Sequence, residues 1–251
     1  MSQSQAEPHG SVQQQSWHMA AAHWCPYICG DDEYPGIAVE YIRTLLGTEQ
    51  IQLTVTILPW TRAIRMTEKG RFDGLLTAVP EEAPTFIFTG QQSGDYQMCF
   101  YRRKGDSARY IQIEDLSDLR LGVIQDYGYG EPLDSYIADH KNSASVVSVA
   151  HENSLSSLAE MLRLKRIDLL IEDPNVVAFN LTSAAQDSMA QAGCLSANPF
   201  YTAFSPAVVA SAQRQQVLDR LLAKPESKAI YQQILRKYRQ RQPQSNPSQS
   251  R

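Results

Sequence analysis

Aromatic and charged side chains follow the predicted strands of this chain, at the points where the strands end. Trp24 and Tyr27 come after the first strand, and Trp60 comes after the second. Loops at the carboxyl ends of strands line the crevice of an open α/β sheet, where aromatic rings supply contact area and a few polar groups orient a ligand. A single aromatic residue would indicate packing, so the prediction rests on their joint placement. The predicted ligand-binding residues are Trp24, Tyr27, Trp60, Arg62, Thr77, Glu81, Gln125, Tyr127, Tyr129 and Asp173.

Catalytic motifs are weak in comparison. The sequence has no Gly-x-Ser-x-Gly nucleophile motif and no His-Glu-x-x-His zinc motif. Gly128-Tyr129-Gly130 lacks the remainder of a dinucleotide-binding or phosphate-binding loop. We therefore predict a protein without enzymatic activity and without a cofactor. One alternative stays open, in which Glu81 or Glu82 is a general base, and that role requires a buried carboxylate with a raised pKa.

The four cysteines are Cys25, Cys29, Cys99 and Cys194. Cys25 and Cys29 flank a three-residue segment, a spacing that a turn can bring within disulfide distance. A metal site that includes His23 is a weaker alternative, because a structural zinc site needs a second pair of ligands that the sequence does not offer. We therefore predict no metal, and leave open a Cys25–Cys29 disulfide or free buried thiols.

The composition limits the classes of partner. The chain has 251 residues, a formal net charge of −4 and 43% hydrophobic residues, which is ordinary for a globular protein. Binding to nucleic acid needs concentrated Lys and Arg, and the single basic cluster, at 236–241, suits the end of a solvated helix. No apolar stretch is long enough for a membrane span. We predict a monomer with no nucleic-acid partner.

Both ends of the chain are polar. The segment Met1 to Gln15 has no apolar core of a secretion signal, so the protein is expected either to be cytosolic or to have lost such a signal. The tail beyond Gln240 is rich in Gln, Ser and Pro and cannot form a core. We predict disorder over residues 1–16 and 241–251.

One sequence pattern, at the junction of a predicted helix and a predicted strand, occurs twice; we call it the repeated phrase. Lys69-Gly70-Arg71-Phe72-Asp73-Gly74-Leu75-Leu76 follows an amphipathic segment and opens a strand, and Lys165-Arg166-Ile167-Asp168-Leu169-Leu170-Ile171 does the same 95 residues later. Any helix-to-strand turn favours such residues, which is the alternative explanation. Two copies of one unit indicate two similar α/β lobes, and a cleft between two lobes is a natural place for a small molecule.

Strand and helix patterns alternate along the chain, which indicates an α/β fold. Chain crossings between the lobes are expected at a polar segment, 103–108, and at an extended stretch, 190–198. Two crossings form a hinge, and a hinge permits closure around a ligand. Two amphipathic helices, over 213–222 and 226–238, are expected to pack back on the first lobe. The predicted lobes are 17–104 plus 196–240 for lobe 1 and 105–195 for lobe 2.

Several segments share their order and spacing with one known family. These segments are Trp24-Cys25-Pro26-Tyr27, Pro35-Gly36-Ile37-Ala38-Val39-Glu40, Trp60 through Leu76, Phe88-Thr89, Asp115-Leu116, Leu121-Gly122-Val123-Ile124 and Arg166 through Asp173. Over Trp17 to Tyr238 the chain resembles the bacterial extracellular solute-binding proteins of the amino-acid-binding type, which have the type II periplasmic binding protein fold. The resemblance implies a two-lobed clamp, export to the periplasm and capture of a small solute for an ABC transporter in the membrane.

The resemblance carries over only in part to the site. Asp173 lies where the family places a carboxylate that binds a ligand amino group by a charge-assisted hydrogen bond. The family also places an arginine that grips the ligand's carboxylate, and Glu82 stands at that position here. Arg62 can replace this arginine only if the pocket is rearranged. We therefore expect an amine-bearing ligand, held partly by cation–π contact with Trp24, Trp60 or Tyr127.

These observations predict a periplasmic solute-binding protein with a small polar ligand and a membrane transporter as its partner. A ligand-sensing module for a signalling partner is the main alternative, because the same fold serves as a sensor. A lyase-type enzyme is a weaker alternative, because the related fold hosts a few such enzymes.

Overall fold

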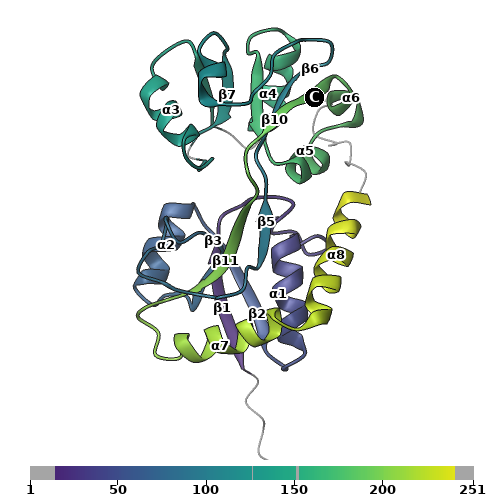
Figure 1. The fold of residues 1–251 in the computed structure, drawn as a ribbon. Helices are drawn as coiled ribbons and strands as arrows, with labels where there is room; N and C mark the ends of the chain where they lie inside the picture. Colours follow the sequence, from purple (N-terminus) through teal and green to yellow (C-terminus); the bar gives the residue numbers. More distant parts are fainter. Residues whose placement is uncertain (1–14, 126, 151–152, 241–251) are drawn as a thin grey trace, which may run out of the picture.

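Two lobes lie on either side of a narrow waist in the computed structural model, which describes residues 15–125, 127–150 and 153–240 (Figure 1). Disorder was predicted for residues 1–16 and 241–251. Of these, residues 1–14 and 241–251 lie outside the described residues. The prediction was wrong for Ser16, which begins strand β1 (Ser16–Ala21). The carbonyl of Gln15 accepts a hydrogen bond from Gln52 N at 2.9 Å, so the pairing of the strand extends back to this residue.

The sheet of the first lobe combines parallel and antiparallel strands. Besides β1 it contains β2 (Gln52–Ile57), β3 (Gly74–Ala78), β4 (Ile87–Phe88), β5 (Gly94–Tyr96) and β11 (Asn198–Phe204). The strand order is β2-β1-β3-β11-β4, and β5 also pairs with β11. β1 is parallel to β2 and β3, whereas β11 is antiparallel to its neighbours.

The sheet of the second lobe repeats this plan. It contains β6 (Cys99–Arg103), β7 (Leu121–Ile124), β8 (Val146–Val149), β9 (Leu169–Glu172) and β10 (Met189–Cys194). The order is β10-β6-β9-β7-β8, with β7 parallel to β8 and β9, and with β6 antiparallel to β9. The series β8-β7-β9-β6 therefore matches β2-β1-β3-β11. In the first lobe β11 comes from beyond the second crossing, whereas β6 follows the first crossing directly.

Helices flank both sheets. The first lobe has α1 (Ile37–Gly47), α2 (Trp60–Glu68), α7 (Ser211–Leu222) and α8 (Pro225–Gln240). The second lobe has α3 (Leu133–His140), α4 (Ser154–Arg163), α5 (Pro174–Asn180), α6 (Ser183–Asp187) and the short 3-10 helix η1 (Ile113–Leu116). α7 and α8 both pack against α1, which confirms that the C-terminal helices return to the first lobe. None of the helices in the described ranges has the length and hydropathy that a membrane crossing requires.

The two copies of the repeated phrase have the same local structure. Asp73 N donates to His18 O at 2.8 Å, and Asp73 Oδ2 accepts from His18 N at 2.8 Å. Asp168 N donates to Arg120 O at 2.8 Å, and Asp168 Oδ2 accepts from Arg120 N at 3.0 Å. Each aspartate also forms an ion pair with an arginine, Arg214 in the first lobe and Arg120 in the second. The repeat therefore marks equivalent structural joints, and its aspartates are committed to the backbone.

The helix ends that precede these aspartates are also equivalent. Gly70 has a φ of 73° and Lys165 a φ of 60°, so both residues are in the left-handed conformation that ends a helix. Arg71 N donates to Met66 O, and Arg166 N donates to Met161 O, closing the same turn in both lobes. Lys165 adopts a conformation that costs a non-glycine residue free energy, which explains why the first copy has glycine there.

The first crossing lies earlier in the chain than predicted. β6 pairs with β9 and β10 in the second sheet, so the chain leaves the first lobe between β5 and β6 and not at 103–108. The second crossing, between β10 and β11, lies within the predicted stretch. The polar segment that suggested the first crossing is a turn after β6, with Gly105 at a φ of 93°. The true crossing, at Gln97-Met98, precedes a strand whose first three residues are buried, and it has no polar run to mark it.

Two short helices, α5 and α6, follow Asp173 in place of one longer helix. Leu181 has extended dihedral angles, and the Thr182 side chain accepts a hydrogen bond from Ala185 N at the start of α6. A β-turn former with a hydroxyl side chain competes with helix continuation, which accounts for the break.

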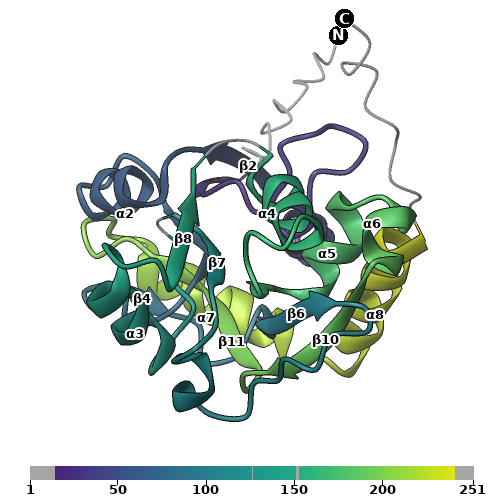
Figure 2. The same ribbon diagram turned by 90° about the horizontal axis from the view of Figure 1, so that it is seen from above.

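One hydrophobic core joins the lobes. It includes residues of α1, α7 and α8 from the first lobe and residues of α4 and α5 from the second lobe. α5 and α8 lie side by side in both views of the molecule (Figures 1 and 2). The lobes are therefore packed together along this side even though their sheets are separate.

Candidate functional site

The carboxyl ends of the parallel strands in both lobes are turned toward the waist. β3 is followed by the loop that carries Glu81 and Glu82, and β7 is followed by the loop that carries Tyr127 and Tyr129. β9 is followed directly by Asp173 and α5. This edge of each sheet is where α/β folds place ligands.

On the first lobe, Trp60 and Glu82 form a pair. Trp60 is the first residue of α2, and its Nε1 donates to Glu82 Oε2 at 3.1 Å. Thr77, at the end of β3, has a φ of 57°, and its hydroxyl donates to the carbonyl of Leu76 at 2.7 Å. The Thr77 hydroxyl is therefore engaged within its own loop.

A loop of the second lobe lies against Glu82. A Cβ atom placed on Gly128 would lie 3.5 Å from Glu82 Oε1, so the two lobes are in near contact here. The pKa of Glu82 is raised, first by loss of solvation and then by the charges of Asp134 and Glu81. The Glu82 side chain is nevertheless exposed to solvent, so the second-lobe loop covers only part of its carboxylate. A carboxylate of the first lobe therefore lies against the second-lobe loop that contains Gly128.

Asp134 holds the loop that carries the predicted tyrosines. Its Oδ1 accepts from Tyr129 N at 2.8 Å and its Oδ2 accepts from Gly130 N at 2.9 Å. The Tyr129 ring is buried, and its hydroxyl accepts from Ile124 N at 2.7 Å. Tyr129 is therefore a structural residue of the loop. Tyr127 is half-buried and lies 6.1 Å from the Tyr129 ring, and burial raises its pKa.

Tyr27 and Asp173 connect the lobes directly. The Tyr27 hydroxyl donates to Asp173 Oδ1 at 3.2 Å and accepts from Asn175 Nδ2 at 2.8 Å. Asp173 is 1% exposed, and it also accepts from Gln97 N, Asn175 N and Val176 N. Burial raises the pKa of Asp173, and burial together with the Asp173 charge raises the pKa of Tyr27. Both oxygens of Asp173 therefore have partners within the chain.

Trp24 extends this contact into an aromatic cluster beside the crossing strands. Its ring stacks on Tyr27 with centroids 4.2 Å apart and meets Tyr96 edge-on at 5.5 Å. Burial raises the pKa of Tyr96, and the charges of Glu82 and Asp134 raise it further. Tyr96 therefore lies between the Tyr27 contact and the carboxylates of the other contact.

Sequence reasoning missed Glu172. This residue ends β9 and is 0% exposed, and its Oε1 accepts from Asp173 N at 2.8 Å. Within the described residues its Oε2 has no hydrogen-bond partner. Burial, followed by the Asp173 charge, raises the pKa of Glu172 to about 8. The signal that could have identified Glu172 is a glutamate at the end of an apolar strand. The prediction named its neighbour, Asp173, in its place.

The remaining predicted residues are less constrained. Glu81, Arg62 and Gln125 are exposed. Arg62 lies in the first turn of α2, two residues from Trp60. Gln125 follows β7, and its backbone N donates to Val149 O at 3.0 Å.

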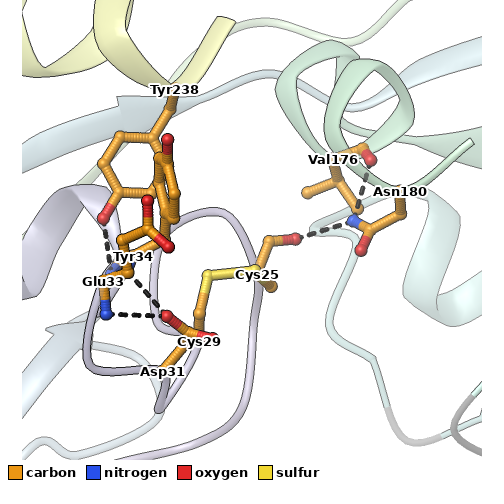
Figure 3. The surroundings of a disulfide bond; sticks show 9 residues. Cys25, Cys29, Asp31, Glu33, Tyr34, Val176, Asn180 and Tyr238 are labelled. Carbon is orange, nitrogen blue, oxygen red and sulfur yellow. Dashed lines mark hydrogen bonds between the residues drawn. A yellow bond between two sulfur atoms is a disulfide. The ribbon is translucent and has the colours of Figure 1, made fainter. Parts of the chain in front are cut away.

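Both pairs of cysteines are disulfides. Cys25 and Cys29 are bonded in the loop after β1, with Cα atoms 4.5 Å apart (Figure 3). This bond decides among the alternatives for the two thiols and removes both from a metal site with His23. In the same loop, Cys25 O accepts from Asn180 Nδ2 of α5 at 3.0 Å, a further bond between the lobes (Figure 3). Cys99 and Cys194 join β6 to β10 at the second-lobe end of both crossings.

A cavity of about 260 Å³ lies elsewhere in the second lobe, between α5, α6, β10 and the Tyr101 ring. None of the ten predicted ligand-binding residues lines it. We assign the candidate site to the contact between the lobes, because charged and aromatic groups of both lobes meet there.

No family model and no curated protein matches the sequence. Solved structures do match its fold. An ancestral arginine-binding protein bound to arginine is 14% identical, with a TM-score of 0.66 over 89% of this chain and 97% of that chain. A histidine kinase sensor domain with similarity to periplasmic binding proteins is 15% identical, with a TM-score of 0.67 over 91% and 97%. An amino acid ABC transporter substrate-binding protein from Streptococcus pneumoniae, bound to L-arginine, is 15% identical, with a TM-score of 0.64 over 90% and 95%.

Proposed function

We propose that this chain, which has the fold of the type II periplasmic binding proteins, is a solute-binding protein for a small, amine-bearing ligand. The ligand would bind between the lobes and be presented to a membrane transporter. Binding would favour the closed arrangement only to the extent that the ligand prefers it. The observation that carries this proposal is the approach of Glu82 from the first lobe to Gly128, in the second-lobe loop whose backbone Asp134 binds.

The charge of this contact favours a cationic ligand. Glu82, Glu81 and Asp134 supply negative charge from both lobes. A cation between carboxylates of both lobes would replace repulsion by two charge-assisted hydrogen bonds. Trp60 and Tyr127 would add cation–π contact with an ammonium or guanidinium group. The ligand-binding residues that we propose are Trp24, Trp60, Arg62, Glu81, Gln125 and Tyr127, joined by Glu82. Tyr27, Thr77, Tyr129 and Asp173 are engaged within the chain and would support the site.

Location outside the cytoplasm is part of the proposal. Two disulfides in a chain of this size are typical of proteins from oxidising compartments such as the periplasm. The partner is proposed to be a transporter, and a sensor kinase is the second candidate because one structure of similar fold is a sensor domain.

The enzymatic alternative rests on Glu82. Its raised pKa is a property of general bases, but the cation hypothesis explains the same shift. A turnover assay on whichever solute binds separates the two. Chemical conversion of that solute would favour a lyase-type role, and its recovery unchanged would favour binding alone.

A thermal-shift screen with amines, amino acids and small organic acids tests the proposed function. A ligand that binds only the native protein raises Tm. At a ligand concentration of 100 times Kd it stabilises the native protein by about 2.7 kcal/mol. We expect amine-bearing compounds to raise Tm and acids without an amine to leave it unchanged. Stabilisation by such acids alone would overturn the proposal.

A further inference from the structure

We infer that the preferred ligand is a cationic amine without a free carboxylate, and this inference rests on the function proposed above. The inference follows from which hydrogen-bonding groups at the contact between the lobes are already occupied. Donors that would bind a carboxylate are satisfied by carboxylates of the chain itself, while acceptors remain in excess.

The start of α3 is the first case. Backbone N–H groups before a helix form a natural binding place for a carboxylate, because they carry the positive end of the helix dipole. Here Tyr129 N and Gly130 N both donate to the Asp134 carboxylate, at 2.8 and 2.9 Å. A ligand carboxylate at this loop would have to displace Asp134 and would meet its charge.

The start of α5 is the second case. Asn175 N and Val176 N donate to Asp173 Oδ1, and Gln97 N donates to Asp173 Oδ2 at 3.0 Å. The Tyr27 hydroxyl adds a fourth hydrogen bond to the same carboxylate. This group of donors is therefore also closed to an anion from the ligand.

On the first lobe, the Trp60 indole is occupied by Glu82. The first turn of α2 has no side-chain cap, and Arg62 lies within it. A carboxylate bound there would lie beside Glu82, whose Oε2 is 3.1 Å from Trp60 Nε1 at the start of the same helix. Like charges so close repel each other even in a partly solvated place, so Glu82 makes this turn a poor anion site.

The acceptors are in the opposite situation. Glu81 and Glu82 are exposed carboxylates in the loop after β3. Glu82 Oε1 would lie 3.5 Å from a Cβ atom placed on Gly128 of the second lobe, so it faces the contact between the lobes. A ligand that brings N–H donors and no anion matches these two carboxylates.

Matched pairs of amino acids and their decarboxylated amines test the inference directly. Isothermal titration calorimetry on the full chain would compare arginine with agmatine, lysine with cadaverine and tyrosine with tyramine. We expect at least one amine to bind tenfold or more tightly than its parent amino acid. Binding of every parent amino acid as tightly as its amine would overturn the inference.

Two variants connect the preference to the contact between the lobes. Glu82→Gln is expected to weaken binding of the preferred amine at least tenfold, because it removes one of the facing charges. Asp134→Asn is expected to narrow the difference between amine and amino acid, because it removes the carboxylate that competes at Tyr129 N and Gly130 N. Glu49→Gln, an exposed glutamate in the turn after α1, is the control and should bind as the parent protein does. An unchanged preference in both variants would contradict the inference.

The outcomes separate this inference from the proposed function. Tight binding of an amino acid with weak binding of its amine would overturn the inference and leave the proposed function standing. Binding restricted to acids that lack an amine, or no binding by any compound of these classes, would overturn both.

Discussion

The two flanks of the contact between the lobes differ in how their polar groups are satisfied. On the α5–α8 flank, Tyr27 bonds Asp173 and Asn175, Arg239 Nε donates to Asn175 Oδ1 at 3.0 Å, and Asn180 donates to Cys25 O. On the α2–α3 flank, Glu82 approaches Gly128, and the charge of Asp134 raises the pKa of Glu82. Figure 1 shows α5 beside α8 on one side of the waist and α2 opposite α3 on the other.

The difference indicates a division of roles. Donors and acceptors are matched on the α5–α8 flank, and an apolar core continues through it, so the lobes can hold together there without a ligand. On the α2–α3 flank the Glu82 carboxylate lies against the second-lobe loop, and the charge of Asp134 raises its pKa, so a cation would complete this flank. One flank would act as a fixed side of the clamp and the other as the side whose closure responds to ligand.

The largest expected effect is on the fixed flank. A Cβ atom added at Gly36 would lie 2.3 Å from Tyr27 O, and Gly36 has a φ of 120°. Gly36→Ala should therefore displace Tyr27 and lower the free energy of unfolding by about 3 kcal/mol or more. Gly47→Ala is the matched control, because an added Cβ there meets nothing within 4 Å. Denaturant unfolding of both variants measures the effect, and equal stability of the two would contradict the proposed role of the Tyr27 contact.

The next effect concerns Glu172, at the border of the two flanks. Its folded-state pKa of about 8 lies above its usual value of 4.5, so the folded protein keeps a proton that the unfolded chain releases. The free energy of unfolding should therefore fall as pH rises from about 4.5 to about 8, by roughly 1.4 kcal/mol per pH unit at most. It should level off above about pH 8. Glu172→Gln should remove this dependence. Urea unfolding at pH 5, 6.5 and 8 checks it, with the exposed Glu114→Gln as the control.

Removal of the Tyr27 hydroxyl should have a smaller effect. Tyr27→Phe leaves Asn175 Nδ2 without its acceptor and removes one donor from the buried Asp173. We expect a loss of about 1–3 kcal/mol in the free energy of unfolding. Tyr201→Phe, at a half-buried tyrosine of β11, should change it by less than about 0.5 kcal/mol. Indistinguishable results for the two variants would argue that the α5–α8 flank is held by its apolar core alone.

The smallest effect is expected on the other flank in the absence of ligand. Glu82→Gln reduces the repulsion toward Asp134 in a partly solvated place, so the ligand-free protein should gain less than about 1 kcal/mol. The gain should disappear at 1 M salt, where charges are screened within about 3 Å. Thermal unfolding at low and high salt measures both. A loss of stability at low salt would show that the hydrogen bond from Trp60 Nε1 to the charged Glu82 outweighs the repulsion from Asp134.

Local patterns predicted the parts of the fold that depend on neighbours in the chain. The two amphipathic C-terminal helices and the repeated helix-to-strand turn each reflect a periodicity or a helix end that the residues themselves set. The position of the first crossing could not be predicted in this way, because β6 is a buried apolar strand that would suit either sheet. The pairing of Cys99 with Cys194, 95 residues apart, depends likewise on which strands meet.

The amino-acid sequence by itself determined the two α/β lobes, the double crossing and the acidic, aromatic character of the loops between them. Tertiary structure decided the use of each group. It gave the Asp173 carboxylate four hydrogen-bond donors. It left Glu172, one residue earlier, buried, and within the described residues its Oε2 has no hydrogen-bond partner. The physical reason is that successive residues at a strand end point to opposite sides, so two adjacent carboxylates meet different surroundings that only the packed lobes define.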